Sequence, residues 1–186
     1  MDNCYKLIKL DNKNFLFNNV EATYIIHLKG NGRLPSIINQ LQKYMLTKEV
    51  YILINYGYKK CKKDKYITLP RYDLIDSFFY IMNDAKTKNY NNILILEDDF
   101  IFNKDILNKK ITNHIDTFLL NNNKNLFLYY IGALPCLQIP TFTQENILIF
   151  SGGTHSVIYP KTFINYINKV NKKKNSRLGY VFKFKF

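Results

Sequence analysis

Tryptophan is absent from this chain of 186 residues, and glycine, proline and cysteine are scarce, with 7, 5 and 3 residues respectively. Because 47% of the residues are hydrophobic and few glycines or prolines interrupt regular structure, the composition excludes a disordered or low-complexity polypeptide. The 15 tyrosines and 14 phenylalanines supply bulky side chains for a core. We expect a single domain over residues 1–186, long enough to bury that core.

Long hydrophobic runs are also missing. The N-terminus lacks the apolar segment of a signal peptide, and the longest mostly apolar stretch, 126–137, is too short to cross a bilayer. Cys4, Cys61 and Cys136 are odd in number and form no Cys-x-x-Cys pair, which favours a reducing compartment over a disulfide framework. We therefore expect a soluble intracellular protein with no transmembrane segment.

Acidic residues are few, 14 against 27 lysines and arginines, so the formal net charge is +13. This excess favours contacts with polyanions, membranes or phosphate-bearing small molecules, although a solvated lysine-rich surface explains it equally well. The lysine clusters at 59–63 and 172–174 come without zinc-finger, helix-turn-helix or RNP-like patterns. Charge alone therefore does not predict nucleic acid as a partner, and a basic nucleic-acid-binding protein stays a third hypothesis.

Apolar runs and turn signals alternate along the chain and predict an α/β fold. Strands are expected at 23–28, 50–54, 93–96, 125–131, 147–150 and 155–159. Helices are expected from 35 to about 45, from 73 to 88, from about 104 to 120 and from 160 to about 170. Strands that alternate with helices favour a mainly parallel sheet flanked by helices. Residues 1–20 predict an N-terminal hairpin appendage or an edge pair, and 171–186 form an atypical basic tail.

Three consecutive carboxylates, Glu97, Asp98 and Asp99, end the apolar strand that begins at Ile93. They repel one another, so a cation at the carboxyl end of the strand, where ligands sit in open α/β sheets, would relieve a large cost. Side chains i and i+2 share one face of a strand, so we expect Glu97 and Asp99 to point together. Carboxylates with water suit Mg²⁺ or Mn²⁺, whereas zinc lacks a Cys/His cluster here. The alternative is a solvated acidic turn.

Two glycine-containing loops also follow strands. The loop 29–33 joins a strand to a helix and carries Arg33 as a candidate anion clamp; a glycine turn with a surface arginine is the alternative. In the loop 151–155, two glycines allow close approach of a ligand, and His155 is placed to hydrogen-bond a sugar hydroxyl or move protons. Its alternative is a glycine hairpin with a structural histidine. His27 lies inside an apolar strand and is expected in the core.

Taken in order, these segments resemble glycosyltransferase family 25, the lipooligosaccharide and procollagen galactosyltransferase group, or a relative of it in large DNA viruses. The matching segments are 24–28 with Arg33 and Leu34, the helix 73–88 that leads into 93–99, and the segment 152–161. The resemblance covers about residues 23–170. It implies a GT-A-like, Rossmann-related fold, a nucleotide-sugar donor and a divalent metal, in a soluble protein of the host cytoplasm or associated with a virus.

The resemblance also implies roles for particular residues. Asp99 and His155 would be catalytic, and Asp99 with Glu97 would hold Mn²⁺ or Mg²⁺. The nucleotide sugar, most simply a UDP-sugar, would be bound by Ile26, His27, Leu28, Arg33, Glu97 and Asp98. The acceptor, a glycan or protein hydroxyl, would lie beside Gly152, Gly153 and Thr154.

Two departures from the family leave a second hypothesis open. His27 stands where an asparagine is usual, and no acidic residue follows Glu145, although the family continues into further strands with an additional acid. The alternative to an active transferase is therefore a truncated, catalytically inactive relative that binds a nucleotide.

Overall fold

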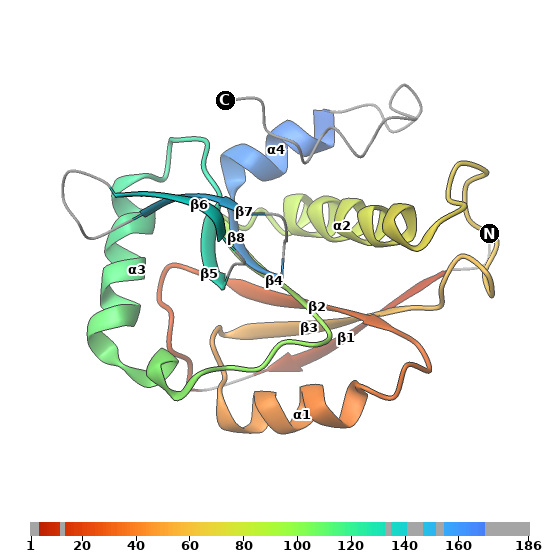
Figure 1. The fold of residues 1–186 in the computed structure, drawn as a ribbon, viewed down its shortest axis with the longest axis horizontal. Coiled ribbons are helices and arrows are strands. Elements are labelled where there is room, and N and C mark those ends of the chain that lie inside the picture. Colours follow the sequence, from red (N-terminus) through yellow and green to blue (C-terminus); the bar gives the residue numbers. More distant parts are fainter. Residues whose placement is uncertain (1–3, 12–13, 133–134, 141–146, 152–154, 170–186) are drawn as a thin grey trace.

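The computed structural model describes residues 4–11, 14–132, 135–140, 147–151 and 155–169. Within these ranges the main sheet has six strands in the order β1-β3-β2-β4-β8-β5, and β6 and β7 form a separate pair (Figure 1). The strands are β1 (Tyr5–Asp11), β2 (Ala22–Leu28), β3 (Glu49–Asn55), β4 (Asn92–Glu97), β5 (Tyr129–Gly132), β6 (Pro135–Pro140), β7 (Ile147–Ser151) and β8 (Ser156–Pro160). The helices are α1 (Leu34–Lys43), α2 (Pro70–Thr87), α3 (Lys109–Asn121) and α4 (Lys161–Lys169), with a 3₁₀ turn, η1 (Lys104–Leu107).

The prediction of an α/β fold is confirmed, but the sheet is mixed rather than mainly parallel. Strands β3, β2 and β4 are parallel, whereas β1, β8 and β5 each pair antiparallel with a neighbour. The reason is the position of β8, which enters between β4 and β5 after the β6–β7 pair instead of after a crossover helix.

Of the two alternatives predicted for residues 1–20, the first strand fits the edge pair and not the hairpin appendage. β1 is the edge strand of the main sheet and pairs antiparallel with β3, from Tyr5 opposite Asn55 to Asp11 opposite Glu49. Residues 14–21 contain no strand. Alternating apolar residues indicate a strand with one buried face, but they do not identify its partner, which here lies about 40 residues further along the chain.

The helices cover both faces of the sheet, α1 and α3 on one and α2 and α4 on the other (Figure 1). Successive residues of the central strands alternate between these two cores, so β2, β3 and β4 are buried on both faces and are nearly continuous apolar runs. The core under α1 and α3 includes Ile25, Ile37, Leu41, Ile52, Leu94, Ile115, Leu119 and Ile158. The core under α2 and α4 includes Tyr24, Leu53, Phe78, Met82, Ile95, Tyr159, Phe163 and Ile167.

Local sequence signals set the ends of the helices. Pro35 and Pro70 stand in the first turns of α1 and α2, where a missing N–H costs nothing. The expected helix over 104–120 is divided at Asn108, whose side chain accepts a hydrogen bond from the backbone N–H of Lys110 at 2.9 Å and starts α3 there. None of the helices in the described ranges is long and apolar enough to cross a membrane.

The carboxyl ends of the parallel strands β2, β3 and β4 meet at one edge of the sheet. Three loops therefore begin at this edge: 29–33 after β2, 56–69 after β3 and 98–103 after β4. The first two lie on the right of Figure 1. This edge is where an open α/β sheet binds ligands.

A disulfide between Cys4 and Cys61 corrects the interpretation of the cysteines as reduced. The pairing of β1 with β3 brings the two residues together, and the backbone N–H of Tyr56 donates to the carbonyl of Cys4 at 3.1 Å. The sequence separation of 57 residues concealed the pair, because their proximity comes only from the pairing of the strands.

Reduction of this bond should lower the free energy of unfolding by about 2–4 kcal/mol, because the bond limits the unfolded chain more than the folded one. Thermal denaturation with and without reductant measures the loss. The variant Cys4→Ser/Cys61→Ser should show the same lower stability and no response to reductant. If all three cysteines are alkylated in protein that has been unfolded without reductant, the disulfide between Cys4 and Cys61 is absent.

Glu49 at the start of β3 is held by three donors. Tyr51 donates its hydroxyl at 2.6 Å, Tyr90 donates a second hydroxyl, and Lys9 lies 3.1 Å away as an ion pair. Burial alone would raise the pKa of Glu49, but these donors outweigh it and lower the pKa to about 2. The charged carboxylate of Glu49 therefore ties β1 and β3 to Tyr90, two residues before β4.

The variant Glu49→Gln should be less stable than the wild type at pH 7, and the difference should shrink as the pH falls. A carboxyl whose pKa drops on folding stabilises the fold above its ordinary value of 4.5 and loses that contribution toward pH 2. Chemical denaturation of both proteins across this range measures the difference. A difference in the free energy of unfolding that stays constant from pH 7 to pH 2 would show that the charge of Glu49 contributes nothing to stability.

Candidate functional site

Asp98 joins the end of β4 to the loop that follows β2. Its Oδ2 accepts hydrogen bonds from the backbone N–H of Leu28 at 3.2 Å and from the side-chain amide of Asn31, and lies 3.3 Å from Nδ1 of His27. Its Oδ1 accepts from Nη1 of Arg33 at 2.6 Å. Burial opposes the charge, but the hydrogen bonds from Arg33, Asn31 and Leu28 outweigh it and hold the pKa of Asp98 below its ordinary value.

These contacts give Asp98 a positioning role. Its side chain is only 10% exposed, and both carboxylate oxygens already accept hydrogen bonds within the protein. A ligand that contacted Asp98 would have to displace one of these donors, whereas the same donors fix the loop 28–33 against the end of β4. The predicted contact of Asp98 with a nucleotide sugar therefore stays a prediction.

Asp99 and Arg33 form the open part of the site. The Asp99 side chain is 50% exposed, and its Oδ2 lies 3.5 Å from Nη1 of Arg33, which is 49% exposed. The hydrogen bond and the charge of Asp98 raise the pKa of the guanidinium, so Arg33 is a permanent cation between the two aspartates. An exposed carboxylate beside an exposed guanidinium can receive a cation and an anion side by side.

Glu97 and His155 lie next to each other because β4 pairs with β8. Leu96 is opposite Ser156, and the backbone N–H of Glu97 approaches the carbonyl of His155 at 3.4 Å. The Nδ1 of His155 is 3.5 Å from Oε1 of Glu97, and the histidine side chain is 46% exposed. The structure therefore brings His155 to the end of the acidic strand, from 58 residues further along the chain.

Glu97 and Asp99, which the sequence predicted to point together, have different neighbours in the structure. β4 ends at Glu97, and the N–H of Phe100 bonds back to the carbonyl of Glu97 at 3.3 Å in a turn. Because the extended geometry stops there, the i, i+2 rule no longer applies. Glu97 contacts His155, whereas Asp99 contacts Arg33.

A metal ion has two candidate ligands here. Among the described residues, no group of three or more His, Cys, Asp or Glu side chains is arranged to hold an ion. Mg²⁺ and Mn²⁺ sites that also bind a diphosphate need few protein carboxylates, since phosphate oxygens and water supply the other positions. The half-exposed carboxylate of Asp99 fits such a site, with Glu97 as the second acid.

The remaining predicted residues separate into buried, exposed and undescribed groups. His27 is 4% exposed and Ile26 is 6% exposed, so His27 is a core residue, as expected, and the side chain of Ile26 packs in the core instead of lining an open pocket. Leu28 is 45% exposed at the edge of the site. The predicted acceptor residues Gly152, Gly153 and Thr154 lie outside the described residues.

Asn31 is the site residue that sequence reasoning missed. It lies between Gly30 and Gly32, whose φ angles of 87° and 80° fit glycine, and these bends turn its amide toward Asp98. The alternation of glycine with asparagine was a signal for a tight turn, but nothing local indicated a partner 67 residues away.

Comparison with known proteins adds no family: no family model matches the chain, and a search of curated proteins finds no match. The fold and the site define an α/β protein with a mixed sheet and an acidic and basic site at its strand carboxyl ends. Its function has to be inferred from these residues.

The variants Asp98→Asn and Asp99→Asn should differ in their effect on the fold. Loss of the charged acceptor of Asp98 should destabilise the protein by about 1.5–3 kcal/mol and increase hydrogen exchange over 28–33. Asp99→Asn changes an exposed side chain and should stay within about 0.5 kcal/mol of the wild type. Exchange followed by mass spectrometry measures both, and equal exchange over 28–33 in the two variants would refute the positioning role.

Proposed function

We propose that this chain is a metal-dependent glycosyltransferase of the GT-A type, which transfers a sugar from a nucleotide sugar to a hydroxyl of a glycan or protein acceptor. The observation that carries the proposal is the position of Arg33, held by Asp98 beside the open carboxylate of Asp99 at the carboxyl end of β4. The ordered resemblance of the sequence to glycosyltransferase family 25 supports the same chemistry.

The arrangement suits a diphosphate. The contacts of Arg33 with the two aspartates use Nη1, while a guanidinium has five N–H donors that match phosphate oxygens. Since Asp98 fixes Arg33, its orientation is set before a ligand arrives, which reduces the entropy lost on binding. A UDP-sugar is the simplest donor that presents such a diphosphate.

Asp99 and Glu97 are the residues that would hold Mn²⁺ or Mg²⁺. The ion, when bound, neutralises the charge that develops on the leaving nucleoside diphosphate. Arg33 adds a permanent positive charge on the same side of the turn. The exposed carboxylate of Asp99 would be a ligand of that ion, and Arg33 would orient the diphosphate by hydrogen bonds.

His155 would act on the acceptor side. Its imidazole is exposed to solvent, and a carboxylate oxygen of Glu97 lies 3.5 Å from Nδ1. The carboxylate favours the tautomer that carries its proton on Nδ1, and this tautomer leaves Nε2 unprotonated. That nitrogen can accept the proton of an acceptor hydroxyl as the hydroxyl attacks the sugar. Glu97 would then stabilise the imidazolium.

A second candidate function is nucleotide binding without transfer. The described residues supply only two candidate metal ligands at the site, because the third acid there, Asp98, is already held by Leu28, Asn31 and Arg33, which favours this alternative. Metal dependence and turnover distinguish the two functions.

A thermal-shift titration with UDP and Mn²⁺, separately and together, tests the proposal. Ligand at about 100 times its dissociation constant should stabilise the fold by roughly 2.7 kcal/mol, visible as a higher Tm. The part of the shift that needs Mn²⁺ should disappear in Asp99→Asn. Asp105→Asn, which removes an exposed acid from η1, is the control with the same change of charge and should keep the full shift.

Transfer from UDP-sugars to small glycan acceptors should follow the same pattern, with Asp99→Asn inactive and Asp105→Asn active. A rise in Tm with UDP that does not depend on Mn²⁺, together with no sugar transfer, would show that the chain binds nucleotides without acting as a transferase. A shift that is unchanged in Asp99→Asn would refute the assignment of the metal site.

A further inference from the structure

The loop 56–69 concentrates positive charge at the same edge of the sheet as the candidate site. It contains five lysines and one aspartate, and it follows β3, which is parallel to β2. The side chain of Leu28 lies beside this loop, since a Cβ at Gly57 would come within 3.1 Å of its Cδ1, and Nζ of Lys29 lies 4.3 Å from the ring centre of Tyr56. The loops after β2 and β3 thus form one continuous surface.

This loop is fixed to the sheet in two places. Cys61 is bonded to Cys4, and Lys63 is buried with its side chain only 3% exposed. The ammonium group of Lys63 forms an ion pair with Asp73 and donates to the hydroxyl of Tyr5 at 2.6 Å. One of the five lysines is therefore used inside the protein and orders the loop.

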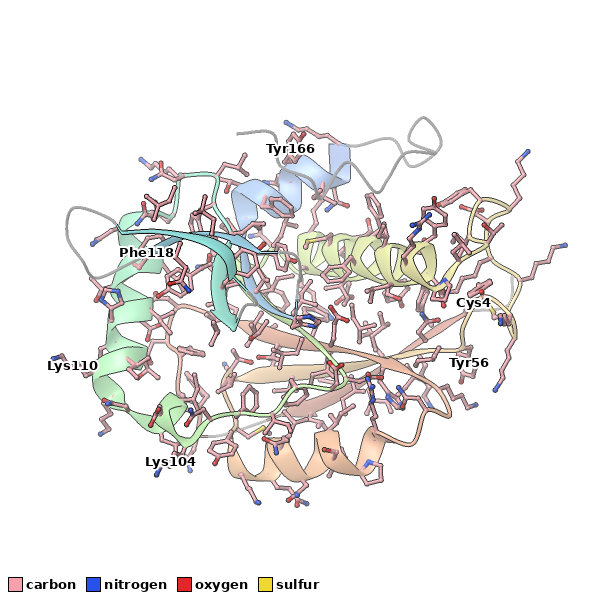
Figure 2. All side chains as sticks on the ribbon, in the orientation of Figure 1. Cys4, Tyr56, Lys104, Lys110, Phe118 and Tyr166 are labelled. Carbon is pink, nitrogen blue, oxygen red and sulfur yellow. A yellow bond between two sulfur atoms is a disulfide. The ribbon has the colours of Figure 1, made fainter. Side chains whose placement is uncertain are left out.

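The other lysines point into solvent. Lys59, Lys60, Lys62 and Lys65 are exposed, and no carboxylate of the described residues lies within 4.0 Å of their ammonium groups. Figure 2 shows long nitrogen-tipped side chains that extend outward from this end of the molecule, near the labelled Cys4 and Tyr56. Because the backbone is anchored at Cys61 and Lys63, these charges are presented together without a large loss of chain entropy on binding.

Exposed leucines accompany the lysines. Leu28 is 45% exposed and Leu69 is 42% exposed, one beside each end of the basic loop. Lysine clusters with apolar side chains at the same surface are typical of proteins that bind the headgroup region of an anionic bilayer.

The tyrosines of this surface fit a membrane better than a nucleic acid. Binding of single-stranded nucleic acid uses aromatic faces on which bases stack. Here Lys29 covers the ring of Tyr56, and the guanidinium of Arg71 lies 5.0 Å from the ring centre of Tyr72. Tyr58 and Tyr66 of the loop are partly buried, whereas four of its lysines are exposed, so the surface offers mainly point charges and leucines.

We propose that the loop 56–69, together with Leu28, Lys29 and Leu69, forms a peripheral binding surface for anionic lipid bilayers. It would place the edge of the sheet that carries Arg33 and Asp99 toward the lipid headgroups. The proposal depends only on the position and charge of this loop, so it stands whether or not the chain transfers sugars.

Co-sedimentation with vesicles tests the surface. The protein should bind phosphatidylcholine vesicles that contain about 30% phosphatidylserine and should dissociate from them at about 0.5 M salt. It should not bind vesicles of pure phosphatidylcholine. The variant Lys59→Gln/Lys60→Gln/Lys62→Gln should bind about 100-fold more weakly, since each lysine near an anionic surface contributes about a fivefold factor.

The matched control is Lys104→Gln/Lys109→Gln/Lys110→Gln, which removes the same charge from η1 and α3. The labelled Lys104 and Lys110 lie at the opposite side of the molecule from Cys4 and Tyr56 in Figure 2. This control should bind like the wild type, and circular dichroism should show that both variants are folded. Equal losses in the two variants, or no binding by the wild type, would overturn the proposal. So would RNA that displaces the protein from vesicles and binds through the same lysines.

Discussion

The buried charge of Asp98 is the constraint on which the rest of the site depends. One carboxylate at the end of β4 accepts hydrogen bonds from the backbone and from two side chains of the loop after β2, so two strands that are adjacent in the sheet are also joined at their carboxyl ends. Because a charged acceptor with several donors resists both protonation and displacement, it holds the loop 28–33 against the end of β4. Arg33 and Asp99 are half-exposed at this edge, whereas Asp98 between their positions is only 10% exposed.

The parallel strands β2, β3 and β4 organise the surface around that site. Each strand ends in a loop that is held by buried or nearly buried contacts. Asp98 holds the loops after β2 and β4 together, and Lys63 and the disulfide hold the loop after β3. In the loops after β3 and β4 a little-exposed charged group, Lys63 or Asp98, is paired, and groups of the same charge next to it are exposed to solvent. The fold thus separates residues that position the edge from residues that can meet a ligand.

Local patterns in the sequence predicted much of this arrangement, and distant pairings explain the rest. The change from apolar residues to Glu97–Asp99 is local, so both the strand and the position of the acids at its end were predictable. The hydrogen bond from Asn31 to Asp98 and the disulfide of Cys4 were not recognised, because the partners lie 67 and 57 residues away. The antiparallel entry of β8 was missed for a similar reason, since periodicity indicates a strand but not its neighbour. The turn that begins at Glu97 was not predicted, and it gives Glu97 and Asp99 different neighbours.

The edge position of β1 has a consequence for association between molecules. An edge strand exposes unpaired backbone groups that can recruit a strand from another chain. β1 stands at the end of the strand order, and it carries the exposed Lys6 and Lys9 along its length. The bond from Cys4 to Cys61 holds the residue that precedes β1 against the loop after β3. Like charges would meet if two such edges approached, and the bonded end cannot peel away to exchange partners, so this side of the sheet opposes domain swapping and fibre-like growth.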